Sequence, residues 1–154
     1  MRVKMVCRMV SKHILAGVVL ASLIAPGIAH EHATGVVRER MDMMEAMAKR
    51  IKSMAERIKT RRDLAAIKSD AEALQTLAPH MVHLFPPGSS DPPTDAKPAI
   101  WQNWSDFEAK ARAFEAASSA LANTDPSDLN ALSMQIRALG RTCGDCHERY
   151  RAKR

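Results

Sequence analysis

Residues 129–150, LNALSMQIRALGRTCGDCHERY, contain the pattern on which the fold depends. Apolar side chains recur in this stretch in alternating steps of three and four residues. This spacing places them on one face of an α-helix. The set comprises Leu129, Leu132, Ile136, Leu139, Cys143, Cys146 and Tyr150. We therefore expect a C-terminal amphipathic helix whose core-facing side includes both cysteines.

Three earlier segments show the same periodicity. The first comprises Val37, Met41, Met44, Ala48, Ile51, Ala55 and Ile58. The second comprises Leu64, Ile67, Ala71, Leu74, Ala78 and Met81. The third comprises Ile100, Trp104, Phe107, Ala111, Phe114, Ser118 and Leu121. β-Branched residues are sparse and no stretch alternates with a period of two, so the chain is predicted to be all-α. Four amphipathic helices of similar length favour an antiparallel four-helix bundle.

The predicted connections agree with this arrangement. Residues 60–62 form a short link, which makes the first two helices antiparallel neighbours. Residues 83–98 are rich in proline and form a long loop, because proline forbids continuous helix. Residues 123–126 form a tight link. There, Asp125 is predicted to cap the last helix and Pro126 to occupy its first position.

The N-terminal segment differs from the rest. It has four basic residues and no acidic residue: Arg2, Lys4, Arg8 and Lys12. An apolar run at 14–24 and the small residues before His30 follow. This order is typical of a secretory signal peptide, and the run is shorter than the roughly 20 residues of a membrane span. We predict a cleaved signal peptide at 1–29 and one domain at 30–154; an uncleaved N-terminal anchor is the alternative.

Charge excludes one class of partner. The chain has 23 basic and 17 acidic residues, a formal charge of +6, and the four basic residues of the signal peptide account for much of it. No basic cluster is interleaved with aromatic residues, so we expect no nucleic-acid binding. We also expect the mature form to have no stable membrane span.

The motif Cys143-Gly-Asp-Cys146-His147 is the Cys-x-x-Cys-His signature of covalent haem attachment. Residues three apart share one helix face, so both thiols can reach the two vinyl groups of one porphyrin edge. His147 can then bind the iron as its fifth ligand. Three alternatives remain: a zinc site, which needs more ligands; a thioredoxin-type pair, which expects a βαβ setting; and a structural disulfide. We predict one haem c, bound in the bundle near the C-terminal helix.

The residues resemble the cytochrome c′ family, the class II c-type cytochromes, over essentially the whole predicted mature chain. The haem motif lies near the C-terminus, where residues 143–151 read CGDCHERYR. Residues 85–89, FPPGS, resemble the Phe-Pro-x-Gly loop of the family. Arg40 and Met44 resemble its Arg-x-x-x-Met or Leu pattern, and residues 101–107 resemble the aromatic start of its third helix.

The resemblance implies roles for three further residues. The position of Met44 faces the open side of the iron, and a low-spin branch of the family has a methionine ligand there; Met41 is the second choice, and simple packing of Met44 is the alternative. Arg40 is expected to pair with a haem propionate, unless it is a solvated surface charge. Arg151 is expected near the proximal face of the haem, unless it only favours the C-terminal end of the helix dipole. A homodimer through the first two helices is also implied.

Three functions compete. The first is a periplasmic electron carrier that exchanges one electron with redox partner proteins and is not an enzyme. The second is a five-coordinate, high-spin haem protein that binds a diatomic gas, nitric oxide or carbon monoxide. The third is a haem-free helical bundle with a disulfide. The sixth ligand of the iron distinguishes the first two functions, and haem content distinguishes both from the third.

Overall fold

The structure is a computed structural model that describes residues 33–153. Its helices are α1 (Gly35–Thr60), α2 (Ala66–Leu77), the short α3 (Ala99–Gln102), α4 (Trp104–Ala122) and α5 (Leu129–Tyr150). Two single turns of 3₁₀ helix, Ala78–His80 and Val82–Leu84, follow α2. The predicted signal peptide at 1–29 lies outside the described residues.

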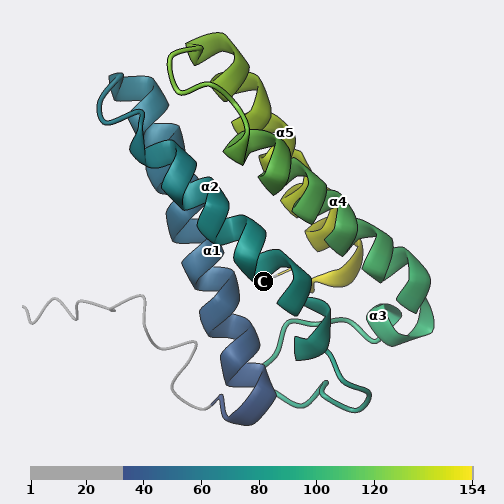
Figure 1. Ribbon diagram of the computed structural model, residues 1–154. Coiled ribbons are helices and arrows are strands. Elements are labelled where there is room, and N and C mark those ends of the chain that lie inside the picture. The colour runs from purple at the N-terminus through teal and green to yellow at the C-terminus, as the bar shows by residue number, and fades with distance from the viewer. Residues whose placement is uncertain (1–32, 154) are drawn as a thin grey trace, which may run out of the picture.

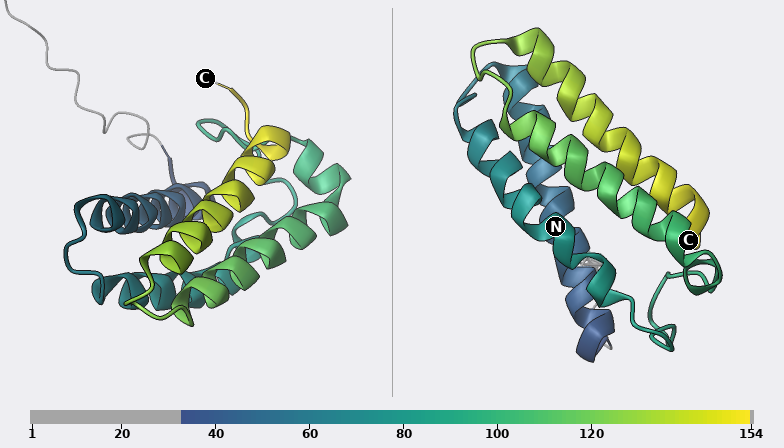
Figure 2. Two further views of the ribbon diagram at one scale, coloured as in Figure 1. Left: turned by 90° about the horizontal axis from the view of Figure 1, so that it is seen from above. Right: turned by 45° about the vertical axis from the view of Figure 1, so that its right-hand side comes forward.

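The four long helices form an antiparallel four-helix bundle, which confirms the predicted fold (Figure 1). Helix α1 packs against α2 and α5, and α4 packs against the same two helices. Figure 2 shows α1 with α2 as one pair and α4 with α5 as a second pair that crosses the first at an angle. Within the described part of the chain, no helix has the length and apolarity that crossing a membrane requires.

The predicted third helix is interrupted at Asn103. This residue leaves the helical conformation, with φ −131° and ψ 48°, and separates α3 from α4. Its side-chain amide donates a hydrogen bond to the carbonyl oxygen of Ala99 at 3.0 Å. An asparagine that bonds to nearby backbone in this way competes with helix continuation. The apolar periodicity runs across the break, so it predicted one helix where the structure has two.

The predicted cap of the last helix was also wrong. Helix α5 begins after Asp128, whose carboxylate accepts a hydrogen bond from the backbone N–H of Ala131 at 2.9 Å. The carboxylate of Asp125 instead accepts bonds from the backbone N–H and the hydroxyl of Ser127, both at 2.8 Å. Two aspartates three residues apart both suit a turn or an N-cap, and the pattern alone did not distinguish them.

Aromatic rings link the loop end of the bundle to α5. Phe107 lies in the core at 2% exposure and contacts three rings. Its centroid lies 4.8 Å from that of Phe85, 5.4 Å from that of Trp104 and 5.4 Å from that of Tyr150. The indole N–H of Trp101 donates to the carbonyl oxygen of Phe85 at 3.0 Å. These contacts fix the start of the loop against α4 and the last turn of α5.

An ion-pair cluster joins α1 to α2. The carboxylate of Asp70 lies 2.8 Å from a guanidinium nitrogen of Arg50 and 2.6 Å from one of Arg57. The Asp70 side chain is 15% exposed, so these contacts are better shielded than ordinary surface ion pairs. Both arginines therefore make contacts within the chain. The homodimer through these helices stays a prediction.

The chain beyond α5 pairs with the loop. Ala96 and Arg151 form an isolated antiparallel bridge. The N–H of Lys97 donates to the carbonyl oxygen of Tyr150 at 2.9 Å, and the N–H of Ala152 donates to that of Asp95 at 2.8 Å. This pairing brings the loop beside the haem motif.

Candidate functional site

A cavity of about 710 Å³ lies among α1, α4, α5 and the loop that precedes α3. Every residue that the sequence singled out for the site lines it: Arg40, Met44, Cys143, Cys146, His147 and Arg151. The cavity volume falls in the range of ligand and cofactor sites, roughly 300–1,000 Å³. The fold therefore brings together residues that are about a hundred positions apart.

The wall formed by α5 carries the attachment motif. Cys143 and Cys146 are partly buried free thiols on the cavity side of the helix. Burial raises the pKa of both thiols, that of Cys146 to about 11, so both are protonated at neutral pH. Burial, and then the charge of Arg151, lower the pKa of His147. Its imidazole is therefore neutral near pH 7, which is the form that binds a metal.

The wall formed by α1 corrects one expectation. The predicted apolar face of this helix is divided between the protein core and the cavity: Val37 is buried and Ile58 packs against the core, whereas most of the other members line the cavity. The cavity-lining members are Met41, Met44, Ala48, Ile51 and Ala55. The side chains of α1 that are buried are Val37, Arg40, Met47 and Met54. Apolar residues cover more than one stripe of this methionine-rich helix, so periodicity did not identify which stripe faces protein.

Arg40 is buried on α1, with 4% exposure, and holds the loop. Its guanidinium donates hydrogen bonds to the carbonyl oxygen of Leu84 at 2.8 and 2.9 Å and to that of Ser89 at 3.1 and 3.2 Å. It also donates to the hydroxyl oxygens of Ser89 at 2.6 Å and Thr94 at 2.9 Å. The same group lies 4.1 Å from the ring centroid of Phe85. All of these acceptors are neutral, and burial lowers the pKa of Arg40. Sequence reasoning offered a propionate partner or a surface position for Arg40, and it missed the contacts with the loop.

Arg151 lies just beyond the C-terminal end of the haem motif, four residues after His147. Its side chain is about half exposed, at 49%, and its guanidinium lies 3.4 Å from a carboxylate oxygen of Asp95. Its backbone N–H donates to the carbonyl oxygen of His147 at 3.0 Å. The backbone of Arg151 is thus fixed next to His147, while its side chain pairs with Asp95 of the loop.

Tyr150 and Asp106 form a contact that the sequence did not reveal. Tyr150 lines the cavity at 3% exposure, and its hydroxyl donates to a carboxylate oxygen of Asp106 at 2.5 Å. Burial first, and then this hydrogen bond, raise the pKa of Tyr150 to about 12. The bond lowers the pKa of the Asp106 carboxyl group. The contact fixes the last turn of α5, which carries His147, against the first turn of α4.

This contact predicts a stability loss at high pH. The folded chain holds Tyr150 protonated, with a pKa raised from 10.0 to about 12. Its contribution is therefore complete below pH 10 and is lost as the pH rises toward 12. We expect Tyr150→Phe to cost about 1 kcal/mol at neutral pH and to reduce the loss of stability above pH 10. Urea unfolding of the two proteins across this pH range measures both effects, and parallel pH profiles would contradict the assignment.

The residues around the cavity fit haem c. Two thiols on one helix face suit thioether attachment, and a neutral imidazole follows immediately. The α1 wall is mostly apolar, as a porphyrin requires. The buried guanidinium of Arg40 suits a propionate carboxylate, since such charge-assisted bonds are strong. The arrangement can hold an iron porphyrin between α1 and α5.

Comparisons with known proteins agree with this geometry. The family model for cytochrome C′ matches residues 35–151. A cytochrome c-556 from Agrobacterium tumefaciens (strain II Chrys) is 39% identical over 70 residues, which are 46% of this chain and 57% of that protein. The chain thus matches little more than half the length of this relative.

Solved structures extend the likeness to the fold. A cytochrome c′ from Rhodobacter spheriodes is 34% identical with a TM-score of 0.71, over 77% of this chain and 96% of that one. A nitric oxide complex of a cytochrome c prime variant from Alcaligenes xylosoxidans is 31% identical with a TM-score of 0.70, over 77% and 94%. The match at 35–151 spans the bundle and the haem motif together. The cofactor is therefore covalently attached haem c, and the chain belongs to the cytochrome c′ family.

Proposed function

We propose that this chain is a periplasmic electron carrier, not an enzyme, in which His147 of α5 and Met44 of α1 bind the haem iron from two sides. One observation carries the proposal: Met44 lines the same cavity as both cysteines and His147. Met44 is partly buried against the core and lies on the helix that packs beside α5. Export to the periplasm rests on the predicted signal peptide at 1–29.

Each group at the site would have a distinct role. The haem iron, when bound, supplies the one-electron couple. His147 offers a neutral nitrogen, and a methionine on the other side raises the reduction potential. The apolar side chains of the α1 wall keep water from the iron. The two thioether links hold the porphyrin against α5.

Charge supports a role for Arg40 at a propionate. A buried guanidinium that bonds only to neutral acceptors has no counter-charge, and a carboxylate in the cavity would supply one. Arg151 already has a carboxylate partner in the half-buried Asp95. We therefore infer that Arg40 compensates a propionate, while Arg151 borders the proximal side next to His147.

Substitution of Met44 tests the ligand assignment. The full protein, matured with its haem, is expected to show a low-spin spectrum that carbon monoxide does not change. Met44→Ala removes the sixth ligand, so we expect a high-spin spectrum that shifts when carbon monoxide is added. Met41→Ala is the matched control, because Met41 lines the same cavity one turn earlier, and it should stay low-spin. A low-spin spectrum that persists in Met44→Ala would refute the assignment.

Gas binding is the second candidate. Met41, Ala48 and Ile51 line the same cavity as Met44, so the α1 wall would offer a diatomic ligand an apolar surround if the thioether does not bind the iron. The nitric oxide complex of the similar cytochrome c prime supports this alternative. A high-spin spectrum of the unsubstituted protein that shifts with carbon monoxide would favour it over electron transfer.

A further inference from the structure

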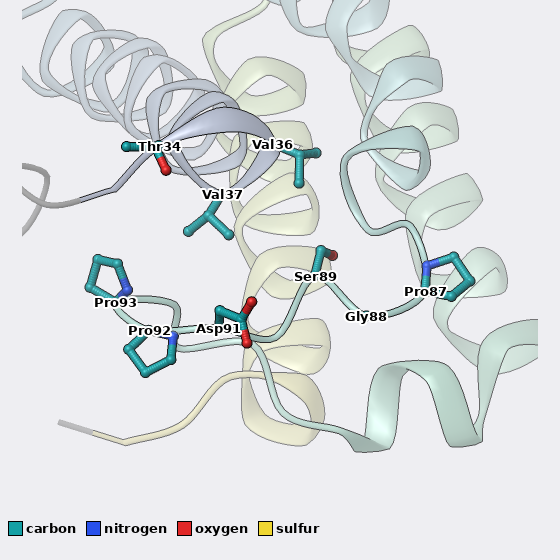
Figure 3. Close-up of a pocket in the computed structure, with 9 residues that line it drawn as sticks. All are labelled: Thr34, Val36, Val37, Pro87, Gly88, Ser89, Asp91, Pro92 and Pro93. Carbon is teal, nitrogen blue, oxygen red and sulfur yellow. The ribbon is translucent and has the colours of Figure 1, made fainter.

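A second cavity, of about 340 Å³, lies between the start of α1 and the loop that also contributes residues to the haem cavity. Its lining combines Thr34, Val36 and Val37 at the start of α1 with Pro87, Ser89 and Pro93 of the loop, among others (Figure 3). Figure 3 shows the loop segment that carries Gly88 and Ser89 passing beside the first turn of α1. The loop thus contributes residues to both cavities.

Hydrogen bonds from Arg40 link the linings of the two cavities. Ser89 lines the outer cavity, whereas Arg40 and Thr94 line the haem cavity. Arg40 donates to the Ser89 hydroxyl at 2.6 Å and to the Thr94 hydroxyl at 2.9 Å. Val37 of the outer lining lies one helical turn before Arg40 and Met41 of the inner lining. Arg40 also donates to the carbonyl oxygen of Ser89 at 3.1 and 3.2 Å, so the contact at this point consists of one guanidinium, two hydroxyl groups and one carbonyl group.

The ends of the loop are held by other contacts. Trp101 bonds to the carbonyl oxygens of Phe85 and Pro86 at 3.0 and 3.1 Å. The pairing of Ala96 with Arg151 fixes the other end. Between these anchors the loop turns at Gly88, whose φ of +82° lies in the left-handed region that glycine adopts without strain. Loss of the bonds to Arg40 can therefore move residues 88–94 while the anchors stay in place.

We propose that the bonds of Arg40 to Ser89 and Thr94 form a gate through which small ligands pass from the outer cavity to the distal side of the haem. Arg40 is the positioning residue of this gate. Opening breaks the two hydroxyl contacts together with the bonds to the Ser89 carbonyl oxygen, and moves residues 88–94 away from α1; the hydroxyl contacts hold the closed position. The gate selects by size, since a diatomic molecule needs a smaller displacement than a chain of several atoms. This inference rests on the proposed site, with the open side of the haem toward Met44.

The test measures ligand entry by stopped flow in ferrous protein that carries Met44→Ala, so that the thioether does not limit binding. Carbon monoxide and n-butyl isocyanide are the small and the large probe. Ser89→Ala with Thr94→Val removes both hydroxyl acceptors and leaves every charge in place. We expect the association rate of n-butyl isocyanide to rise roughly tenfold, the change that about 1.4 kcal/mol produces. The carbon monoxide rate should change by less than about twofold, a few tenths of a kcal/mol.

Two variants make the result specific. Ser90→Ala removes a neighbouring, exposed hydroxyl of the same loop and should leave both rates unchanged. Thr94→Ser in the Ser89→Ala protein retains one acceptor and should restore part of the slow entry. Equal isocyanide rates in the Ser89/Thr94 and Ser90 variants would overturn the gate. A rise of the same size for both probes would also overturn it, because that would mean general loosening. The spectrum of Met44→Ala before a ligand is added tests separately whether Met44 binds the iron.

Discussion

Replacing both Cys143 and Cys146 with serine is expected to abolish covalent haem attachment. No other cysteine occurs in residues 30–154, so no second thiol can form a thioether. After acidified-acetone extraction, the unsubstituted protein should retain its colour and the double variant should lose it. A haem stain on a denaturing gel provides the same readout without extraction.

The same variant should also lose stability. The cavity of about 710 Å³ would then depend on a non-covalently held porphyrin, or would be left empty. Even one large-to-small substitution in a core costs about 2–5 kcal/mol, partly because of the cavity left behind. That is a large part of the roughly 5–15 kcal/mol that stabilises a typical domain. We expect a broad, weakly cooperative urea transition by circular dichroism.

Gly144→Ala is the control for this experiment. Gly144 lies between the two cysteines in α5, and a Cβ at this position meets nothing within 4 Å. Alanine should retain the haem and raise the free energy of unfolding by about 0.5–1 kcal/mol, because glycine weakens a helix. Covalent haem in the double cysteine variant would refute the attachment assignment.

Replacing Arg40 with methionine is expected to cost about 3–5 kcal/mol of unfolding free energy. The guanidinium is buried, and its removal leaves the carbonyl oxygens of Leu84 and Ser89 without these donors. Each buried acceptor left unsatisfied costs about 1–3 kcal/mol. The stacking contact with Phe85 is lost as well. Urea unfolding of the haem-loaded protein measures the sum.

Arg38→Met is the matched control on the same helix. The Arg38 side chain is 47% exposed and pairs with Asp42 at 3.0 Å, four residues along α1. Exposed pairs of this kind contribute about 0.3–0.5 kcal/mol. Similar losses for the two substitutions would mean that burial of Arg40 contributes little, and that the loop is held by its anchors alone.

Local patterns were sufficient for the main features of this protein. The apolar periodicity of residues 129–150 predicted α5, and three similar patterns predicted the bundle, because helix formation and amphipathicity depend on near neighbours in the chain. The motif from Cys143 to His147 predicted the cofactor, because its chemistry depends only on spacing along one helix. The proline-rich stretch predicted a long loop for the same local reason.

Other features depend on side-chain hydrogen bonds, some local and some between residues distant in sequence. The break at Asn103 and the choice of Asp128 over Asp125 as a cap were decided by competing side-chain bonds that periodicity does not record. Arg40 shows this over a longer range: its burial rules out the surface position, and the structure shows it bound to a loop more than forty residues away, while its pairing with a propionate stays a prediction.

The sequence by itself determined that the chain forms amphipathic helices and carries a haem motif, since both follow from residues within a few positions of one another. Only the tertiary structure decided which stripe of α1 faces the cavity, that Tyr150 meets Asp106, and that Arg40 fastens the loop. These contacts arise when the bundle closes, because the partner of each group is then selected by burial and hydrogen bonding rather than by spacing in the chain.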